Sequence, residues 1–173
     1  MKKSILSLLL ACGTGFLLCA CSPKYDWREI RGEGAPYSVM LPAKPASYSR
    51  PVNIGGNKVT MTMTATEVDG ITFAVGTAEL PDAATAARAV TAMKDALVNN
   101  IHGRVQREAA TSNGAAADIT VDASGKDPSG QARVLHARFL ARDKRVYQVI
   151  VTGKEGAVPQ EAVDTFLASF KPA

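Results

Sequence analysis

Two aspartates and two histidines are the first residues whose type and spacing could do chemistry. Asp118 and Asp122 lie four residues apart in an alternating segment, so on a strand they would share one face. Such carboxylates can bind Ca²⁺, but we favour solvated surface charge. The two histidines, His102 and His136, come with no third ligand at a zinc-site spacing. We therefore predict no metal site and no cofactor.

Signatures of catalysis are equally sparse. The sequence lacks Gly-x-Ser-x-Gly, and it lacks Ser-x-x-Lys with its partner motifs. Ser124-Gly125-Lys126 resembles half of a P-loop, but Thr120 stands where that loop needs a glycine. We interpret the tripeptide as part of a turn, and we predict no catalytic residue and no enzymatic activity.

One local concentration of basic residues could meet anionic lipid or lipopolysaccharide. An alternative is that these charges keep strand edges soluble, and the sequence leaves both interpretations open. The cluster consists of Arg133, Arg138, Arg142, Lys144 and Arg145.

The most specific chemistry lies near the N-terminus. Lys2 and Lys3 precede an apolar stretch that ends in Leu18-Cys19-Ala20-Cys21. This layout is typical of a secretory signal, and its end resembles the lipobox of bacterial lipoproteins. A thiol can accept diacylglycerol as a thioether, and further acyl chains make such an anchor firm. We expect residues 1–20 to be a signal peptide and Cys21 to be lipidated.

Three alternatives compete with lipidation at Cys21. The stretch could remain as an uncleaved anchor, although about 15 apolar residues are fewer than the roughly 20 that a span needs. Lipidation at Cys12 would leave a short apolar stretch, and lipidation at Cys19 would place bulky Leu18 at the cleavage site. Ser22 follows Cys21, which by resemblance to enterobacterial sorting favours a periplasm-facing position on the outer rather than the inner membrane.

Processing would change the composition of the mature chain. Without Lys2 and Lys3, 18 basic and 16 acidic residues remain, a net charge of +2. Nucleic-acid binding needs a concentrated basic surface, so we do not expect it. The three cysteines lie in residues 1–21, so the domain should contain no disulfide and no thiol nucleophile.

Residues 21–36 are expected to form a lipidated tether, in which Tyr25 and Trp27 either lie among lipid headgroups or pack on the domain. A single domain then occupies residues 37–173. Its first strand, 37–41, is followed by a stretch that Pro45 and Pro51 interrupt.

Asp69-Gly70 predicts a type I′ hairpin turn between strands 59–68 and 71–79. This register places Phe73 on the face that carries the threonines of the first strand, and Met61 and Met63 on the other face. Apolar residues on both faces indicate a sheet that is covered on both sides.

The remaining elements complete an α+β pattern with a mostly antiparallel sheet and helices on both faces. Asp82 is expected to cap a long helix that ends near Gly103. Strands are expected over 104–110, 115–121, 133–141 and 145–152, with a final helix after Pro159.

Three segments resemble a bacterial group related to the PsbP and Mog1 proteins: Tyr37-Ser-Val-Met-Leu-Pro42, the hairpin from Ala137 to Val149, and Phe166-Leu-Ala-Ser-Phe-Lys171. The resemblance spans about residues 37–171. It implies an α/β/α sandwich and a non-enzymatic, protein-binding character, and it transfers no binding residue.

We therefore expect a membrane-anchored envelope lipoprotein whose domain binds another envelope protein as an accessory module. The alternative is a carrier of a small ligand or lipid that uses a pocket between helix 83–101 and the sheet. Fold alone does not decide between these functions.

Overall fold

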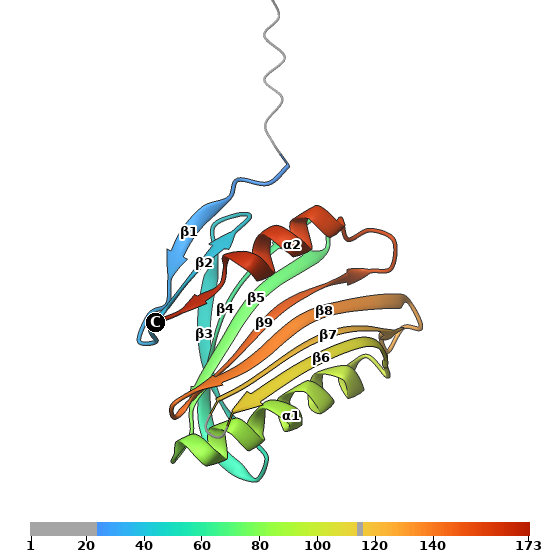
Figure 1. Ribbon diagram of the computed structural model, residues 1–173. Helices are drawn as coiled ribbons and strands as arrows, with labels where there is room; N and C mark the ends of the chain where they lie inside the picture. Colours follow the sequence, from blue (N-terminus) through green and yellow to red (C-terminus); the bar gives the residue numbers. More distant parts are fainter. Residues whose placement is uncertain (1–23, 114–115) are drawn as a thin grey trace, which may run out of the picture.

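The computed structural model describes residues 24–113 and 116–173. These residues form one α+β domain (Figure 1). In chain order its elements are β1 (Arg28–Arg31), β2 (Tyr37–Leu41), β3 (Ala46–Ile54), β4 (Asn57–Val68), β5 (Ile71–Glu79), α1 (Ala83–Asn100), β6 (Arg104–Asn113), β7 (Ala116–Lys126), β8 (Ala132–Arg142), β9 (Arg145–Lys154), α2 (Gln160–Ser169) and β10 (Lys171–Pro172).

A large antiparallel sheet has the strand order β3-β4-β5-β9-β8-β7-β6. Strands β6 to β9 follow one another as hairpins, whereas β5 pairs with β9 from a distant part of the chain. Strands β1, β2 and β10 form a separate small sheet. Strands β3 and β6 are therefore the two edges of the large sheet.

The large sheet is covered on both faces, as the sequence predicted. Helix α1 packs on one face, against β7, β8 and β9 (Figure 1). Helix α2 and the small sheet lie on the other face, where they contribute to a second hydrophobic core. The architecture is thus an α/β/α sandwich with a small sheet added to the α2 layer.

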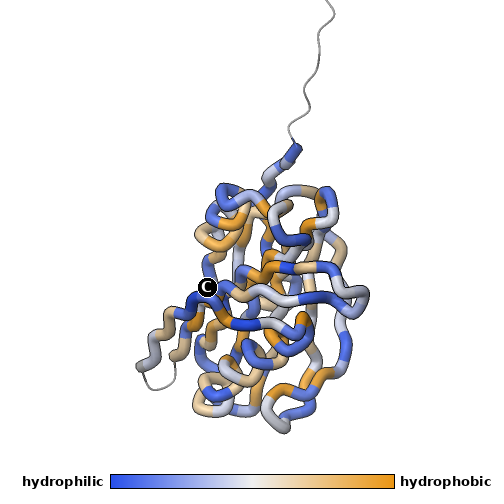
Figure 2. The backbone as a smooth tube through the Cα atoms, turned by 90° about the vertical axis from the view of Figure 1, so that its right-hand side faces the viewer, coloured by the Kyte–Doolittle hydropathy of each residue, from blue (hydrophilic) through white to orange (hydrophobic). Residues whose placement is uncertain are grey.

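Two hydrophobic cores follow from alternation along the strands, which Figure 2 shows as changing hydropathy along the chain. Met61, Met63 and Ala74 belong to the core beneath α1. Phe73 and Val75 belong to the core beneath α2. The faces predicted from the hairpin register are therefore confirmed.

The local signals for the hairpin and the long helix are confirmed as well. Asp69 and Gly70 have φ angles of 50° and 74°, which a type I′ turn requires. Asp82 caps α1, because its carboxylate accepts hydrogen bonds from the Thr85 backbone N–H at 2.7 Å and from the Thr85 hydroxyl at 2.9 Å. This satisfies one of the free N–H groups at the helix start.

The domain begins earlier than the expected boundary at Tyr37. Strand β1 pairs with β2, and Asp26 N donates to the Pro42 carbonyl at 2.9 Å. Tyr25 and Trp27 lie 6.1 Å and 6.0 Å from the Phe73 ring, both edge-on. The expected tether 21–36 is therefore wrong from residue 24 onward, since aromatic packing and strand pairing fix this segment to the domain.

Two further expectations need correction. Pro51 lies within β3 and does not interrupt it, because an edge strand tolerates a residue without an N–H donor. Ser124-Gly125-Lys126 continues β7 and is not part of a turn. The turn that follows is held by Asp127, whose carboxylate accepts from the Ser129 and Gln131 backbone N–H groups at 2.9 Å and 3.1 Å.

No helix within residues 24–113 and 116–173 is long and apolar enough to span a bilayer. Cys12, Cys19 and Cys21, and with them the expected signal peptide and lipid anchor, lie outside the described residues.

Candidate functional site

The α2 side of β6, β7 and β8 carries a row of charged side chains, here called the polar face. Alternation explains it, because Ile119 and Val121 of β7 point into the core beneath α1 while Asp118 and Asp122 point the other way. The side chains that define the polar face are Arg107, Asp118, Asp122, His136 and Arg138, and their exposed fractions are 82%, 19%, 30%, 18% and 29%.

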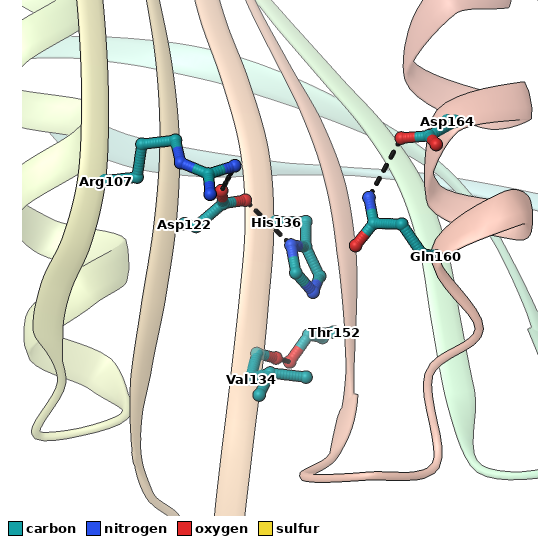
Figure 3. Close-up of polar contacts among 7 residues, drawn as sticks. All are labelled: Arg107, Asp122, Val134, His136, Thr152, Gln160 and Asp164. Atoms are coloured by element: carbon teal, nitrogen blue, oxygen red, sulfur yellow. Dashed lines mark hydrogen bonds and ion pairs between the residues drawn. The ribbon is translucent and has the colours of Figure 1, made fainter.

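Asp122 lies between His136 and Arg107 (Figure 3). Its carboxylate is 2.7 Å from His136 Nδ1 and 3.4 Å from Arg107 Nη1. The register of β7 and β8 places Asp122 directly opposite His136. An Asp–His pair of this kind orients the imidazole and leaves Nε2 for a further interaction.

This pair supplies the base and the orienting carboxylate of a hydrolytic triad, but not the nucleophile. A nucleophile must lie within hydrogen-bond reach of the base, and among the described residues no hydroxyl donates to or accepts from His136. Across the sheet toward α2, Figure 3 shows Gln160 bonded to Asp164 of its own helix at 2.9 Å. Among the described residues the Asp122–His136 pair therefore has an oriented imidazole but no hydroxyl hydrogen-bonded to it.

Asp118 and Arg138 form the second ion pair of the polar face. The guanidinium donates two hydrogen bonds to the two carboxylate oxygens, at 3.0 Å and 2.6 Å, which is the strong bidentate arrangement. The Asp118 carboxylate raises the pKa of Arg138. Arg142 approaches the same carboxylate at 3.8 Å. Asp118 and Asp122 therefore each face cations, and within the described ranges no three His, Cys, Asp or Glu residues gather as a metal site would require.

The basic cluster of the sequence does not form one surface. Arg133 pairs with Lys154 at one end of β8, whereas Arg142 pairs with Arg145 at the other. Nine residue steps along β8 separate Arg133 from Arg142 by roughly 30 Å. In addition, Arg145 donates to Glu79 at 2.8 Å. The charged residues of the β8–β9 turn, Asp143 and Lys144, therefore belong to a different surface from Arg133.

The N-terminal segment reaches the domain at one end of the sheet. Lys24 forms an ion pair with Asp69 in the β4–β5 turn at 3.1 Å. The β8–β9 turn, with Asp143 and Lys144, lies at the opposite end, because Glu79 of β5 and not Ile71 pairs with Arg145. The N-terminal segment therefore contacts the β4–β5 end of the sheet and not the β8–β9 end.

His102 has a structural place outside the polar face. It follows α1 with a φ of 45°, and its backbone N–H donates to the Asn99 carbonyl at 2.9 Å. Gly103 N donates to the Val98 carbonyl, also at 2.9 Å. These two bonds make a Schellman motif in which a histidine occupies the left-handed position that glycine prefers.

A small pocket lies between the second half of α1 and strands β3 and β4, where the carrier alternative places it. We call it the helix pocket. Its volume is about 200 Å³, and Arg50, Val52, Met61, Met93 and Gln148 are among its lining residues. Pockets for drug-sized ligands measure about 300–1,000 Å³, so the helix pocket is too small for a lipid chain.

Known proteins resemble this chain only through their structures. No family model and no curated protein matches the sequence. The solution structure of the cyanobacterial PsbP protein CyanoP, from Synechocystis, matches with a TM-score of 0.50 and 13% identity, over 95% of this chain and 99% of that one. The fold is PsbP-like. At this identity the match concerns the fold alone.

Two further solved structures match the PsbP-like domain more loosely. One is a crystal structure from Bacteroides thetaiotaomicron, with a TM-score of 0.49, 10% identity and 84% of this chain covered. Our chain spans about half of that protein, 48% of its length. The other is a protein of unknown function from Pseudomonas aeruginosa described as a putative regulator, with a TM-score of 0.38, 13% identity, and coverage of 79% of this chain and 88% of that one.

Proposed function

We propose that this protein is a lipid-anchored envelope lipoprotein and that its PsbP-like domain binds another protein through the polar face. The observation that carries the proposal is that paired charged side chains of β6–β8 remain partly exposed, and Arg107 largely exposed, on the face that α2 and the small sheet cover elsewhere. In the polar face Asp122, His136, Asp118 and Arg138 are held in fixed pairs. Fixed charges contribute specificity to an interface, since an unmatched partner would leave them unpaired.

The proposed anchor also constrains how the domain sits. If Cys21 carries the lipid, only Ser22 and Pro23 lie between it and Lys24, and the three residue steps reach at most about 11 Å. The β4–β5 turn and Trp27 would then lie next to the headgroups, in the outer membrane and on its periplasmic side. The polar face would lie beside the membrane and remain available to a neighbouring envelope protein.

The anchor is tested by comparing the full chain with its Cys21→Ser variant in a bacterial host. We expect the mass of the wild-type product to show acyl chains and removal of residues 1–20, and the protein to fractionate with membranes. The variant should lack the acyl mass and lose this fractionation. Equal masses and equal fractionation of the two forms would overturn the anchor.

The binding surface is tested with a photo-crosslinking residue at Arg107, the most exposed member of the polar face. A matched control carries the same residue at Ser49, which is exposed on β3 at the opposite edge of the sheet. We expect a discrete crosslinked protein from position 107 only. The proposal is wrong if neither position gives a product, or if both give the same one.

The carrier alternative rests on the helix pocket. Its lining combines apolar side chains with polar ones such as Arg50 and Gln148, which suits a small ligand, although its volume excludes a whole acyl chain. Native mass spectrometry of protein purified from membranes separates the two functions, because an organic molecule that co-purifies with the domain would support the carrier.

A further inference from the structure

Two methionines and a glutamine converge over a glycine beneath α1. Met63 of β4 lies directly opposite Gly76 of β5, and Gln148 of β9 lies opposite the same glycine on its other side. Gln148 Nε2 is 3.4 Å from Met63 Sδ and 3.6 Å from Met61 Sδ. The two methionines are 8% and 6% exposed, so both sulfurs belong to the protein interior.

Gly76 makes room for this arrangement. A Cβ at this position would lie 2.5 Å from Met63 Sδ and 2.8 Å from Gln148 Nε2. Glycine weakens the interior of a strand, and there it often marks a close approach of other atoms. The missing side chain thus lets a sulfur and an amide from the neighbouring strands pack directly against the backbone of β5.

The chemistry of the three side chains is unusual for a hydrophobic core. Thioether sulfur is a weak hydrogen-bond acceptor, yet both sulfurs approach a single amide nitrogen. Rotation of the Gln148 amide by half a turn replaces this nitrogen by the carbonyl oxygen Oε1, since the two ends of the amide have nearly the same shape. The three side chains would then bring two soft sulfurs and one oxygen into one another's neighbourhood.

We propose that Met61, Met63 and Gln148 form a binding site for a soft monovalent cation, Cu(I) or its analogue Ag(I). Thioether ligands select Cu(I), and the unbranched methionine side chain can adjust to close around an ion. Met61 and Gln148 also line the helix pocket, which is large enough to admit an ion. Met93 of α1 lines the same pocket.

Because the three ligands carry no charge, the site should select a monovalent over a divalent cation. Met61, Met63 and Gln148 contribute no carboxylate, thiolate or imidazole, so nothing in the set offsets the desolvation of a divalent ion. The one charged side chain that lines the pocket is Arg50, which is exposed on the edge strand, where solvent screens it. Because none of the three ligands titrates, affinity should be the same at pH 5 and pH 8, unlike at a thiolate or imidazole site.

The test uses the full chain with Cys12, Cys19 and Cys21 replaced by serine, so that no thiol competes for the metal. Silver nitrate is titrated in chloride-free buffer and followed by calorimetry and by NMR of ¹³C-labelled methionine methyl groups. We expect one bound ion and shifted methyl signals of Met61 and Met63, with no shift at Met40, which lies on β2 outside this core.

Substitutions then test which methionines bind the ion. Met61→Leu together with Met63→Leu keeps the volume and should weaken binding by at least about tenfold, whereas the matched Met40→Leu control should bind as the parent does. The NMR measurement needs no variant and so holds even if the double variant unfolds. Unmoved Met61 and Met63 signals, or undiminished binding by the folded double variant, would overturn the proposal.

Discussion

Single residues at the two ends of α1 determine how well this helix is capped. At its C-terminal end His102 adopts a left-handed conformation with a φ of 45°. A side chain in this region costs about 1–2 kcal/mol because its Cβ approaches the carbonyl oxygen, and glycine avoids that cost.

His102→Gly should therefore stabilise the protein. After allowing for the greater freedom of glycine in the unfolded chain, we expect a gain of about 0.5–1 kcal/mol. Urea unfolding measures it, with His102→Ala as the control that keeps the Cβ. A loss of stability in the glycine variant would show that the imidazole itself contributes.

At the other end of α1, the Asp82 carboxylate gives a pH-dependent contribution. Hydrogen bonds from the Thr85 backbone and hydroxyl lower the pKa of Asp82. Since the folded pKa is below the unfolded one, this stabilisation is complete above the unfolded pKa and is lost as the pH falls through the folded pKa. Asp82→Ala should thus lower the unfolding midpoint at pH 7 and have little effect near pH 2.

Asp82→Asn is the informative control, because asparagine also caps helices but does not titrate. It should retain most of the stability at pH 7. The interpretation fails if Asp82→Ala lowers the midpoint equally at pH 7 and pH 2.

At the scale of elements, the missing side chain of Gly125 allows β7 to contact the end of α1. A Cβ on Gly125 would lie 2.1 Å from the Ile101 carbonyl oxygen and 2.7 Å from Gly103 Cα. Both clashing atoms belong to the backbone, so a change of rotamer cannot relieve the clash. Next to this contact, Lys126 N donates to the same Ile101 carbonyl at 2.7 Å.

Gly125→Ala should accordingly destabilise the domain by about 2–3 kcal/mol, through overpacking and loss of this hydrogen bond. Thermal unfolding followed by circular dichroism measures the loss. Gly130→Ala is a control for steric crowding, because open space surrounds Gly130, although its φ of 83° adds strain. Equal or smaller loss at Gly125 would contradict the close approach.

The sequence predicted those elements whose signals are local. Asp69-Gly70 determines a hairpin register, and from it follow the two faces of β4 and β5. The same register implies that Met63 faces Gly76, so half of the proposed metal site could have been found. Gln148 could not, because its position depends on the pairing of β5 with β9, which no local signal encodes.

Prolines and short polar stretches give ambiguous local signals. Pro51 predicts an interruption, yet it lies within β3, because edge and central strands look alike in sequence. The Asp122–His136 pair depends on the length of the turn after β7, which begins at Asp127 and not at Ser124. The Phe73 ring that holds Tyr25 and Trp27 comes from another sheet, so the docking of this segment is a tertiary effect.

At the scale of the whole molecule, the docked N-terminal segment can be followed by fluorescence. Trp27 is the only tryptophan of the chain, and it packs against Phe73. If this segment is part of the cooperative unit, tryptophan emission and far-ultraviolet circular dichroism should change at the same urea concentration. Phe73→Leu should shift both midpoints together. A tryptophan transition at clearly lower urea would indicate a segment that detaches before the domain unfolds.

The pairing of Glu79 with Arg145 has a consequence for biosynthesis. Strand β5 leaves the ribosome well before β9, the partner that occupies its open edge. At 5–20 residues per second the interval is roughly 3–13 seconds, during which an apolar strand has one unfilled edge. Because β9 is the last strand of the large sheet along the chain, the central seam between β5 and β9 cannot form before it. A chain truncated before β9 should therefore expose an edge of β5 and aggregate more readily than the complete domain.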